Sequence, residues 1–185
     1  AVGERQGVAG FRANVAGVAA GLDAALDERL RLGVAFAYAN AGVDSKSTVA
    51  PQHMDTDVHQ LIGYGSYAID DRTEASFQAD IGHNRNRGTR TITFAPAVAS
   101  ASYDSLTLHA GAGFARTYPL APDTRFIPSL RLDYTTMKDR AYSETGAGAL
   151  NLGVDGRRVD QLLASFDARL VHSLSDRMTL GLNAG

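Results

Sequence analysis

A strict alternation of large and mostly small side chains runs through residues 30–39, the second half of the stretch 22–40, and limits the folds open to this chain. One parity holds Leu30, Leu32, Val34, Phe36 and Tyr38, and the other holds Arg31, Gly33, Ala35, Ala37 and Ala39. A period of two residues predicts a β-strand, because successive side chains point to opposite faces. Residues 18–24 alternate in the same way, and the acidic pair Asp27-Glu28 predicts a tight turn that joins the two runs as a hairpin.

The small face indicates how this hairpin is oriented. In a soluble β-protein the bulky face would fill the core, whereas in a membrane barrel it would meet lipid. Glycine and alanine with an occasional Arg or Asp suit a crowded polar lumen, and about 10 residues is the length that a tilted strand needs to cross a bilayer. The pattern therefore favours an all-β fold, an antiparallel up-and-down transmembrane β-barrel.

Composition limits the remaining classes. The chain has 185 residues, a formal net charge of -2 and 44% hydrophobic residues, and this near-neutral charge gives no support for nucleic-acid binding. The absence of cysteine removes disulfides and thiolate metal sites. No apolar run approaches the roughly 20 residues of a transmembrane helix, and no signal segment begins at Ala1, so any export signal is expected to lie outside this sequence.

Eight strands are predicted, joined by connections of alternating length. The strands are expected at about 11–25, 30–40, 58–69, 74–82, 106–114, 126–135, 161–171 and 178–185. Short turns near 27–28 and at 70–72, 119–123 and 172–176 alternate with long loops at 41–56, 83–102 and 136–158. The facing of 58–69 is undecided, and Asp155-Gly156 predicts the corner of a small hairpin inside the last loop. Short turns on one side and long loops on the other are typical of outer-membrane barrels, with the short turns periplasmic.

Several of these segments together resemble a known family. They are Gly21-Leu22-Asp23, LRLGVAFAYANAGVD at 30–44, Tyr64-Gly65-Ser66-Tyr67, FIPSLRLDY at 126–134 and AYSETGAGALNLGV at 141–154. In this order, over nearly the whole chain, they resemble the C-terminal β-domain, or translocator, of classical type V autotransporters. The resemblance implies an integral barrel of twelve strands in the outer membrane of a Gram-negative bacterium. It also implies a helix threading the pore, which is not found in this sequence.

The ends of the sequence depart from the family pattern. The eight predicted strands correspond to about the second through ninth of the family's twelve, and neither a passenger nor the usual aromatic-ended terminal strand is found. Open strand edges are very costly in lipid. We therefore expect residues 1–185 to form one autotransporter β-barrel domain that is partial.

The resemblance implies a transport function rather than an enzymatic one. The barrel would anchor its own N-terminal passenger and help export it to the cell surface through a hydrated conduit, with passenger folding as the energy source. Implied partners are the passenger, the outer-membrane barrel-assembly machinery, and outer-membrane lipid with lipopolysaccharide. No cofactor and no catalytic residue is expected here, although self-cleavage inside the lumen stays open.

Parity divides the strand residues into two predicted sets. The polar set is expected to line the lumen, as a hydrated ion-pair network or as the passenger's route: Arg31, Glu74, Gln78, Asp80, His109, Arg131, Asp133, Asp167 and Arg169. The apolar set is expected to face lipid: Leu30, Leu32, Val34, Phe36, Phe77, Ile81, Leu106, Leu108, Phe114, Leu130, Leu132, Leu162, Phe166 and Leu170.

Other motifs carry weaker hypotheses. The five histidines, at 53, 59, 83, 109 and 172, are dispersed, so no metal site is expected. A basic patch of Arg85, Arg87 and Arg90 in a predicted outer loop is either solvated or in contact with lipopolysaccharide phosphates. Tyrosines near predicted strand ends are either an aromatic girdle or ordinary packing residues; they are Tyr38, Tyr64, Tyr118 and Tyr134.

Two other function classes stay open on the sequence alone. A soluble lipocalin-like ligand-binding barrel would bury Leu30, Val34, Phe77 and Leu108 at its centre. A porin-type channel would conduct ions steadily, and an outer-membrane enzyme would need an acid, base or nucleophile cluster that the sequence does not assemble.

Overall fold

The chain is built almost entirely of β-strands in a computed structural model that describes residues 10–48, 50–175 and 178–185. The long strands are β1 (Phe11–Ala25), β2 (Leu30–Ser45), β3 (Gln52–Asp70), β4 (Thr73–Ile92), β5 (Ala97–Arg116), β7 (Thr124–Asp139) and β10 (Arg157–Ser175). The short elements are β6 (Tyr118–Ala121), β8 (Tyr142–Ser143), the 3-10 turn η1 (Gly148–Leu150), β9 (Gly153–Val154) and β11 (Met178–Ala184). No helix in the described ranges is long and apolar enough to cross a membrane.

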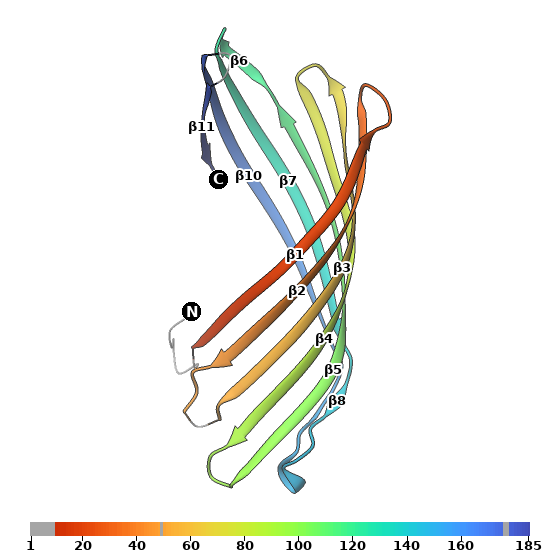
Figure 1. The fold of residues 1–185 in the computed structure, drawn as a ribbon, viewed down its shortest axis with the longest axis vertical. Helices are drawn as coiled ribbons and strands as arrows, with labels where there is room; N and C mark the ends of the chain where they lie inside the picture. Colours follow the sequence, from red (N-terminus) through yellow and green to blue (C-terminus); the bar gives the residue numbers. More distant parts are fainter. Residues whose placement is uncertain (1–9, 49, 176–177) are drawn as a thin grey trace.

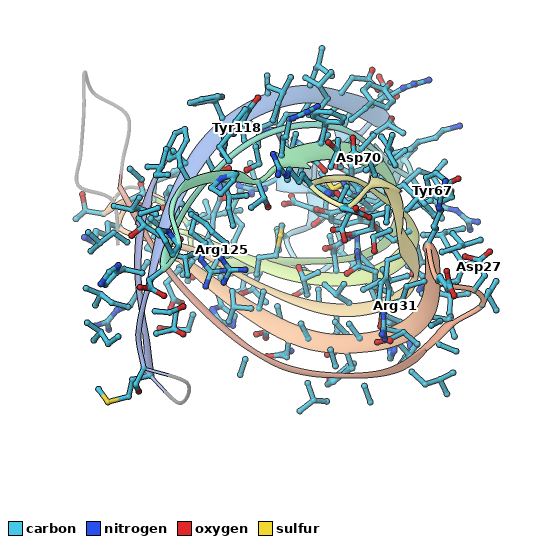
Figure 2. The ribbon with its side chains drawn as sticks, turned by 90° about the horizontal axis from the view of Figure 1, so that it is seen from above. Asp27, Arg31, Tyr67, Asp70, Tyr118 and Arg125 are labelled. Carbon is cyan, nitrogen blue, oxygen red and sulfur yellow. The ribbon has the colours of Figure 1, made fainter. Side chains whose placement is uncertain are left out.

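All the strands except β8 and β9 form one curved antiparallel sheet. Its order is β1-β2-β3-β4-β5-β7-β10-β11, with β6 paired to β7, so the long strands pair with their successors in the chain. Figure 1 shows the strands tilted side by side, and Figure 2 shows the sheet curling around a concave face on which Arg125 lies. This architecture confirms the predicted all-β, antiparallel up-and-down fold.

The prediction of long loops at 41–56 and 83–102 is wrong. Strand β2 continues to Ser45 and β3 begins at Gln52, while β4 continues to Ile92 and β5 begins at Ala97. Most of 41–56 and 83–102 is therefore regular sheet. These stretches carry polar side chains on both faces, so the hydrophobic alternation that marks a membrane strand disappears although the backbone ladder continues. The strands thus extend well past the length that a bilayer requires.

The third predicted loop keeps its place but is shorter. Strand β7 runs to Asp139 and β10 starts at Arg157, which leaves 140–156 as the connection. Within it β8 pairs with β9, so Asp155-Gly156 joins β9 to β10 and is not the predicted hairpin corner. The short connection predicted at 172–176 also moves, because β10 runs on to Ser175.

The two faces of the sheet differ sharply in chemistry. Val34, Phe77 and Leu108 lie on the convex face with 45%, 42% and 43% of their surfaces exposed. Among the described residues, no large side chain is fully buried. The burial that a lipocalin-like interior requires at these positions is therefore contradicted, because the sheet is a single layer with its apolar side outward.

Strand β3, whose facing the sequence left undecided, follows the same rule. Tyr64 lies on the concave face above Gly33, where an added Cβ would overlap the tyrosine ring. Tyr64 therefore does not belong to a convex aromatic girdle. Tyr38, Tyr118 and Tyr134 lie on the convex face, where the Tyr134 hydroxyl donates to Asp160 Oδ1 at 2.8 Å.

Candidate functional site

The most structured part of the concave face is a cluster of charged side chains on β4, β5 and β7. His109 Nδ1 lies 2.6 Å from Asp80 Oδ2, and His109 Nε2 lies 2.8 Å from Asp133 Oδ1. Arg131 donates from Nε to both oxygens of Asp133 at 3.0 and 2.9 Å. The register opposes Asp80 to His109. Asp133 is opposite the glycine two residues further along β5. A histidine on the middle strand therefore bridges carboxylates on its two neighbours.

Asp80 accepts further hydrogen bonds, and the Arg131 guanidinium occupies the space left by the missing side chain of Gly111. Gln60 and Gln78 donate to the Asp80 carboxylate at 2.6 and 2.9 Å, so a residue that is 7% exposed has partners on both oxygens. Across the sheet, an added Cβ at Gly111 would overlap Asp133 Oδ1 and the Arg131 guanidinium. A side chain at position 111 would displace the ends of the Arg131 and Asp133 side chains, because their ion pair lies directly over the backbone of β5.

A second polar layer continues toward the ends of the strands that carry the 140–156 loop. Thr56 donates to Asn86 at 2.8 Å, Asn86 donates to Ser105 at 2.8 Å, and Ser105 donates to Asp139 at 2.6 Å. Arg157 Nε closes this series on Asp139 at 2.5 Å. Four side-chain hydrogen bonds thus connect five adjacent strands, β3, β4, β5, β7 and β10, across the concave face.

The 140–156 loop folds against the concave face beyond this layer. Arg90 Nε donates to Glu144 Oε1 at 3.0 Å, and Arg90 also donates to the Leu150 carbonyl at 3.0 Å. The amide of Leu152 donates to Glu144 Oε2 at 2.9 Å. Ser100 and Thr145 exchange backbone hydrogen bonds of 2.8 and 2.9 Å. The loop is therefore bound to β4 and β5 by one ion pair and a short stretch of ladder.

The ion pair between Arg90 on β4 and Glu144 in this loop is largely shielded from solvent. The Arg90 and Glu144 side chains are 18% and 10% exposed. Hydrogen bonds from Arg90 lower the pKa of Glu144, and the Glu144 carboxylate raises the pKa of Arg90. Both groups are therefore fully charged near neutral pH.

A cavity of about 410 Å³ lies between this loop and β1 to β5. Its lining mixes aromatic and aliphatic side chains, among them Tyr103, Tyr142 and Leu152, with Arg90 and Glu144. The Tyr103 and Tyr142 rings stack with centroids 4.3 Å apart. The mouth of the concave face thus offers both apolar area and charge to an extended chain.

The structure places all nine residues of the predicted lumen set on the concave face. Four join the central cluster together with Gln78, and Arg31 pairs with Asp23. Glu74, Asp167 and Arg169 lie on this face without joining the cluster. Sequence reasoning missed concave residues that share parity with that set; they are Gln60, Asn84, Asn86, Thr107, Asp139 and Arg157. Gln60 and Thr107 lie inside the predicted strands at 58–69 and 106–114, and extending the alternation past the predicted strand ends would have found the other four.

All residues of the predicted lipid-facing set lie on the convex face.

The prediction of a basic patch in an outer loop is wrong. Arg85, Arg87 and Arg90 are on strand β4 and not in a loop, so consecutive odd and even positions point to opposite faces. Arg87 is on the convex face and pairs with Asp57, while Arg90 is on the concave face and pairs with Glu144. In the described part of the chain, no group of three His, Asp or Glu side chains is arranged to hold a metal ion.

Comparisons with known proteins agree with this geometry. The chain is 25% identical over 185 residues to outer membrane protein A of Rickettsia conorii and 22% identical over 183 residues to outer membrane protein B of Rickettsia prowazekii. Each alignment covers 94% of this chain but only 9% and 11% of those proteins, so the chain spans about a tenth of these relatives.

The fold is also found among solved structures. The translocator domain of autotransporter NalP from Neisseria meningitidis superposes with a TM-score of 0.81 at 19% identity, over 92% of this chain and 58% of that one. The copper transporter OprC superposes with a TM-score of 0.52 over 28% of its length, which is a likeness of fold alone. The model of the family described as Autotransporter beta-domain matches residues 2–185 of this chain. The chain therefore belongs to the autotransporter β-domain family.

Proposed function

We propose that this domain is the membrane-embedded translocator of a longer outer-membrane protein, which anchors an N-terminal passenger and supports its export to the cell surface. The observation that carries this proposal is the division of the sheet into a convex apolar face and a concave polar one. The convex residues meet hydrocarbon, and the concave residues line a hydrated conduit. An extended passenger in that conduit keeps its backbone groups away from lipid.

The same proposal assigns a structural role to the central cluster. Both ring nitrogens of His109 are occupied by carboxylates, and Arg131 neutralises one of them. Such a network keeps the concave wall rigid and wet rather than positioning a nucleophile. We therefore propose that the domain is not an enzyme. The barrel-assembly machinery and lipopolysaccharide complete its proposed partners.

The two open edges of the sheet support a larger β-domain. Among the described residues, β1 pairs only with β2, and β11 pairs only with β10. Unpaired backbone groups are very costly in lipid. In this proposal, residues 1–185 form one partial domain whose sheet is completed by further strands.

Neighbouring residues on β7 test the facing directly. The chain has no cysteine, so single substitutions Ser129→Cys on the concave face and Leu130→Cys on the convex face give a matched pair. In outer membranes containing the full-length protein, a charged, water-soluble maleimide should label position 129 and not position 130. Labelling of both positions, or of position 130 alone, would refute the assignment of the faces.

Export itself is tested by crosslinking during secretion. A photoreactive amino acid at position 129 should crosslink to a stalled passenger, and the same group at position 130 should crosslink only to lipid or assembly factors. A stalled passenger that never reaches position 129 would count against the conduit. Steady ion conductance in the absence of a passenger would favour the porin-type alternative.

A further inference from the structure

Basic side chains gather on the convex face where its apolar surface ends. One cross-strand row contains His83, Leu106, Lys138 and Arg158 on β4, β5, β7 and β10. Neighbouring strands in such a row lie about 4.8 Å apart. The basic side chains therefore form a short band that follows the curvature of the convex face, and Arg140 lies two residues beyond Lys138 on the same side.

This band borders the apolar surface on its inner side. The next row toward the opposite end of the strands contains Ile81 and Leu108, which are 46% and 43% exposed, on β4 and β5, and Thr136 and Asp160 on β7 and β10. The row after it contains Ala79, Ala110, Tyr134 and Leu162. Tyr134 donates to Asp160, and Arg158 Nη2 lies 3.2 Å from the Tyr134 hydroxyl. A tyrosine with its polar end toward charged groups marks the level where hydrocarbon meets headgroups.

Two cations of the band have no protein partner. Within the described residues, neither Lys138 nor Arg140 makes a side-chain ion pair or hydrogen bond. Arg158, in contrast, donates to Asp160 at 3.0 Å, and His83 lies 3.6 Å from Asp104. Lys138 lies next to the last residue of β7, Arg140 is the first residue of the connection that follows, and both side chains line the same cavity. Their charges are therefore available to an external anion.

The surface between these side chains is hollowed. A cavity of about 300 Å³ is lined by His83, Asp104, Leu106, Lys138 and Arg140. A second cavity of about 170 Å³ adjoins it. Leu106 and Lys138 line both, and Arg158 and Leu108 line the second. The first offers cations to a phosphate, and the second offers apolar surface to the acyl chains attached to it.

We propose that this convex band is a binding site for the phosphorylated glucosamine headgroup of lipid A, with Lys138 and Arg140 as its phosphate ligands. Ammonium and guanidinium groups both bind phosphate, and the planar guanidinium does so in a bidentate manner. The carboxylates of Asp104 and Asp160 in the same region are oriented toward His83 and Arg158. The basic groups of the band thus outnumber its acidic ones, which suits an anionic ligand.

The choice of lipid A rests on the proposed orientation of the domain. The band lies toward the 140–156 loop, the end of an outer-membrane barrel that faces the cell exterior when short turns are periplasmic (Figure 1). The outer leaflet on that side consists mainly of lipopolysaccharide. At the opposite end, the convex Arg116 guanidinium instead lies over the Tyr118 ring, 5.8 Å from its centroid.

Lipid titration of the delipidated full-length protein in detergent tests the site. Bis-phosphorylated lipid A should bind the double variant Lys138→Ala/Arg140→Ala at least ten-fold more weakly than the wild type in native mass spectrometry. Arg29→Ala/Arg72→Ala, which removes two exposed cations from the short turns, is the matched control and should bind as wild type. Heat-modifiable mobility on gels verifies that each variant is folded.

Three outcomes would overturn the proposal. They are unchanged lipid A affinity in the Ala double variant, equal affinity for dephosphorylated lipid A, and equal affinity for phosphatidylglycerol, which would assign the site to phospholipid. Lys138→Arg/Arg140→Lys keeps both charges and should retain binding within about three-fold, because the phosphate contacts survive the exchange. Passenger display, measured on cells in parallel, should remain normal in the Ala variant, so a failed lipid site is distinguishable from a failed translocator.

Discussion

Replacing Glu144 by glutamine should release the 140–156 loop from the mouth of the concave face. The carboxylate receives two hydrogen bonds from Arg90 and one from the Leu152 amide. Glutamine keeps the size of the side chain but turns one acceptor into a donor that points at a guanidinium. The substitution therefore removes a charge-assisted contact and adds an unfavourable one without creating a cavity.

The size of the effect follows from the exposure of the carboxylate. A fully exposed ion pair contributes about 0–1 kcal/mol, and breaking a buried pair costs about 3–5 kcal/mol. With 10% of the Glu144 side chain exposed, the pair is close to buried, yet Leu150 still satisfies part of the arginine. We expect a loss of about 2 kcal/mol in the free energy of loop docking, which corresponds to roughly 30-fold in the docking equilibrium.

Hydrogen exchange measures this equilibrium residue by residue. In the full-length protein reconstituted in nanodiscs, amide protection of Thr145 and Leu152 should fall by roughly 30-fold, because local opening controls exchange. Asp155→Asn, in the same loop, removes a carboxylate that has no ion-pair partner in the described structure and should leave protection unchanged. A decrease below about two-fold in Glu144→Gln would show that the ion pair does not hold the loop.

Three further perturbations follow from the same structure. Gly111→Val should lower the free energy of unfolding in urea by about 1–3 kcal/mol because its side chain overlaps an ion pair, whereas Gly82→Ala, with its nearest contact at 3.5 Å, should be tolerated; equal losses would refute this account. Leu132→Arg on the convex face should lower the free energy of folding into lipid vesicles by about 2–4 kcal/mol, and an unchanged folding yield in vesicles would exclude lipid contact. Hydrogen bonds from Arg90 lower the pKa of Glu144, so this pair should stabilise loop docking fully above the ordinary glutamate pKa of 4.5 and lose its effect as the pH falls through the lowered value. Amide protection that declines instead between pH 7 and 6 would assign the switch to another group.

The facing of the strands could be predicted because it depends on local alternation alone. Leu132 and Asp133 are adjacent, and parity places them on opposite faces whatever the rest of the chain does. The strand ends could not be predicted from the same signal. Around Asp44 and His53 both faces are polar, so nothing in the sequence separates a solvated strand from a solvated loop, and only the cross-strand ladder does so.

The candidate site could be predicted only in part for a related reason. Asp80, His109 and Asp133 follow from parity, but their convergence depends on the register of three strands, which the sequence does not supply. Arg90 and Glu144 lie 54 residues apart, and no local pattern relates them. Contacts of this kind arise from the way a long connection folds back over the sheet.

The edges of the sheet connect its stability to its proposed function. Strand β1 is exposed along its whole length, whereas β4 alternates between buried and exposed residues because strands flank it on both sides. Each backbone group on an open edge costs several kcal/mol in hydrocarbon, so β1 and β11 must gain partners before the domain is stable in a bilayer. Closing those edges also encloses the concave face and separates its polar cluster from lipid. In the proposed function, the same pairing step that stabilises the sheet in the membrane would also create the conduit.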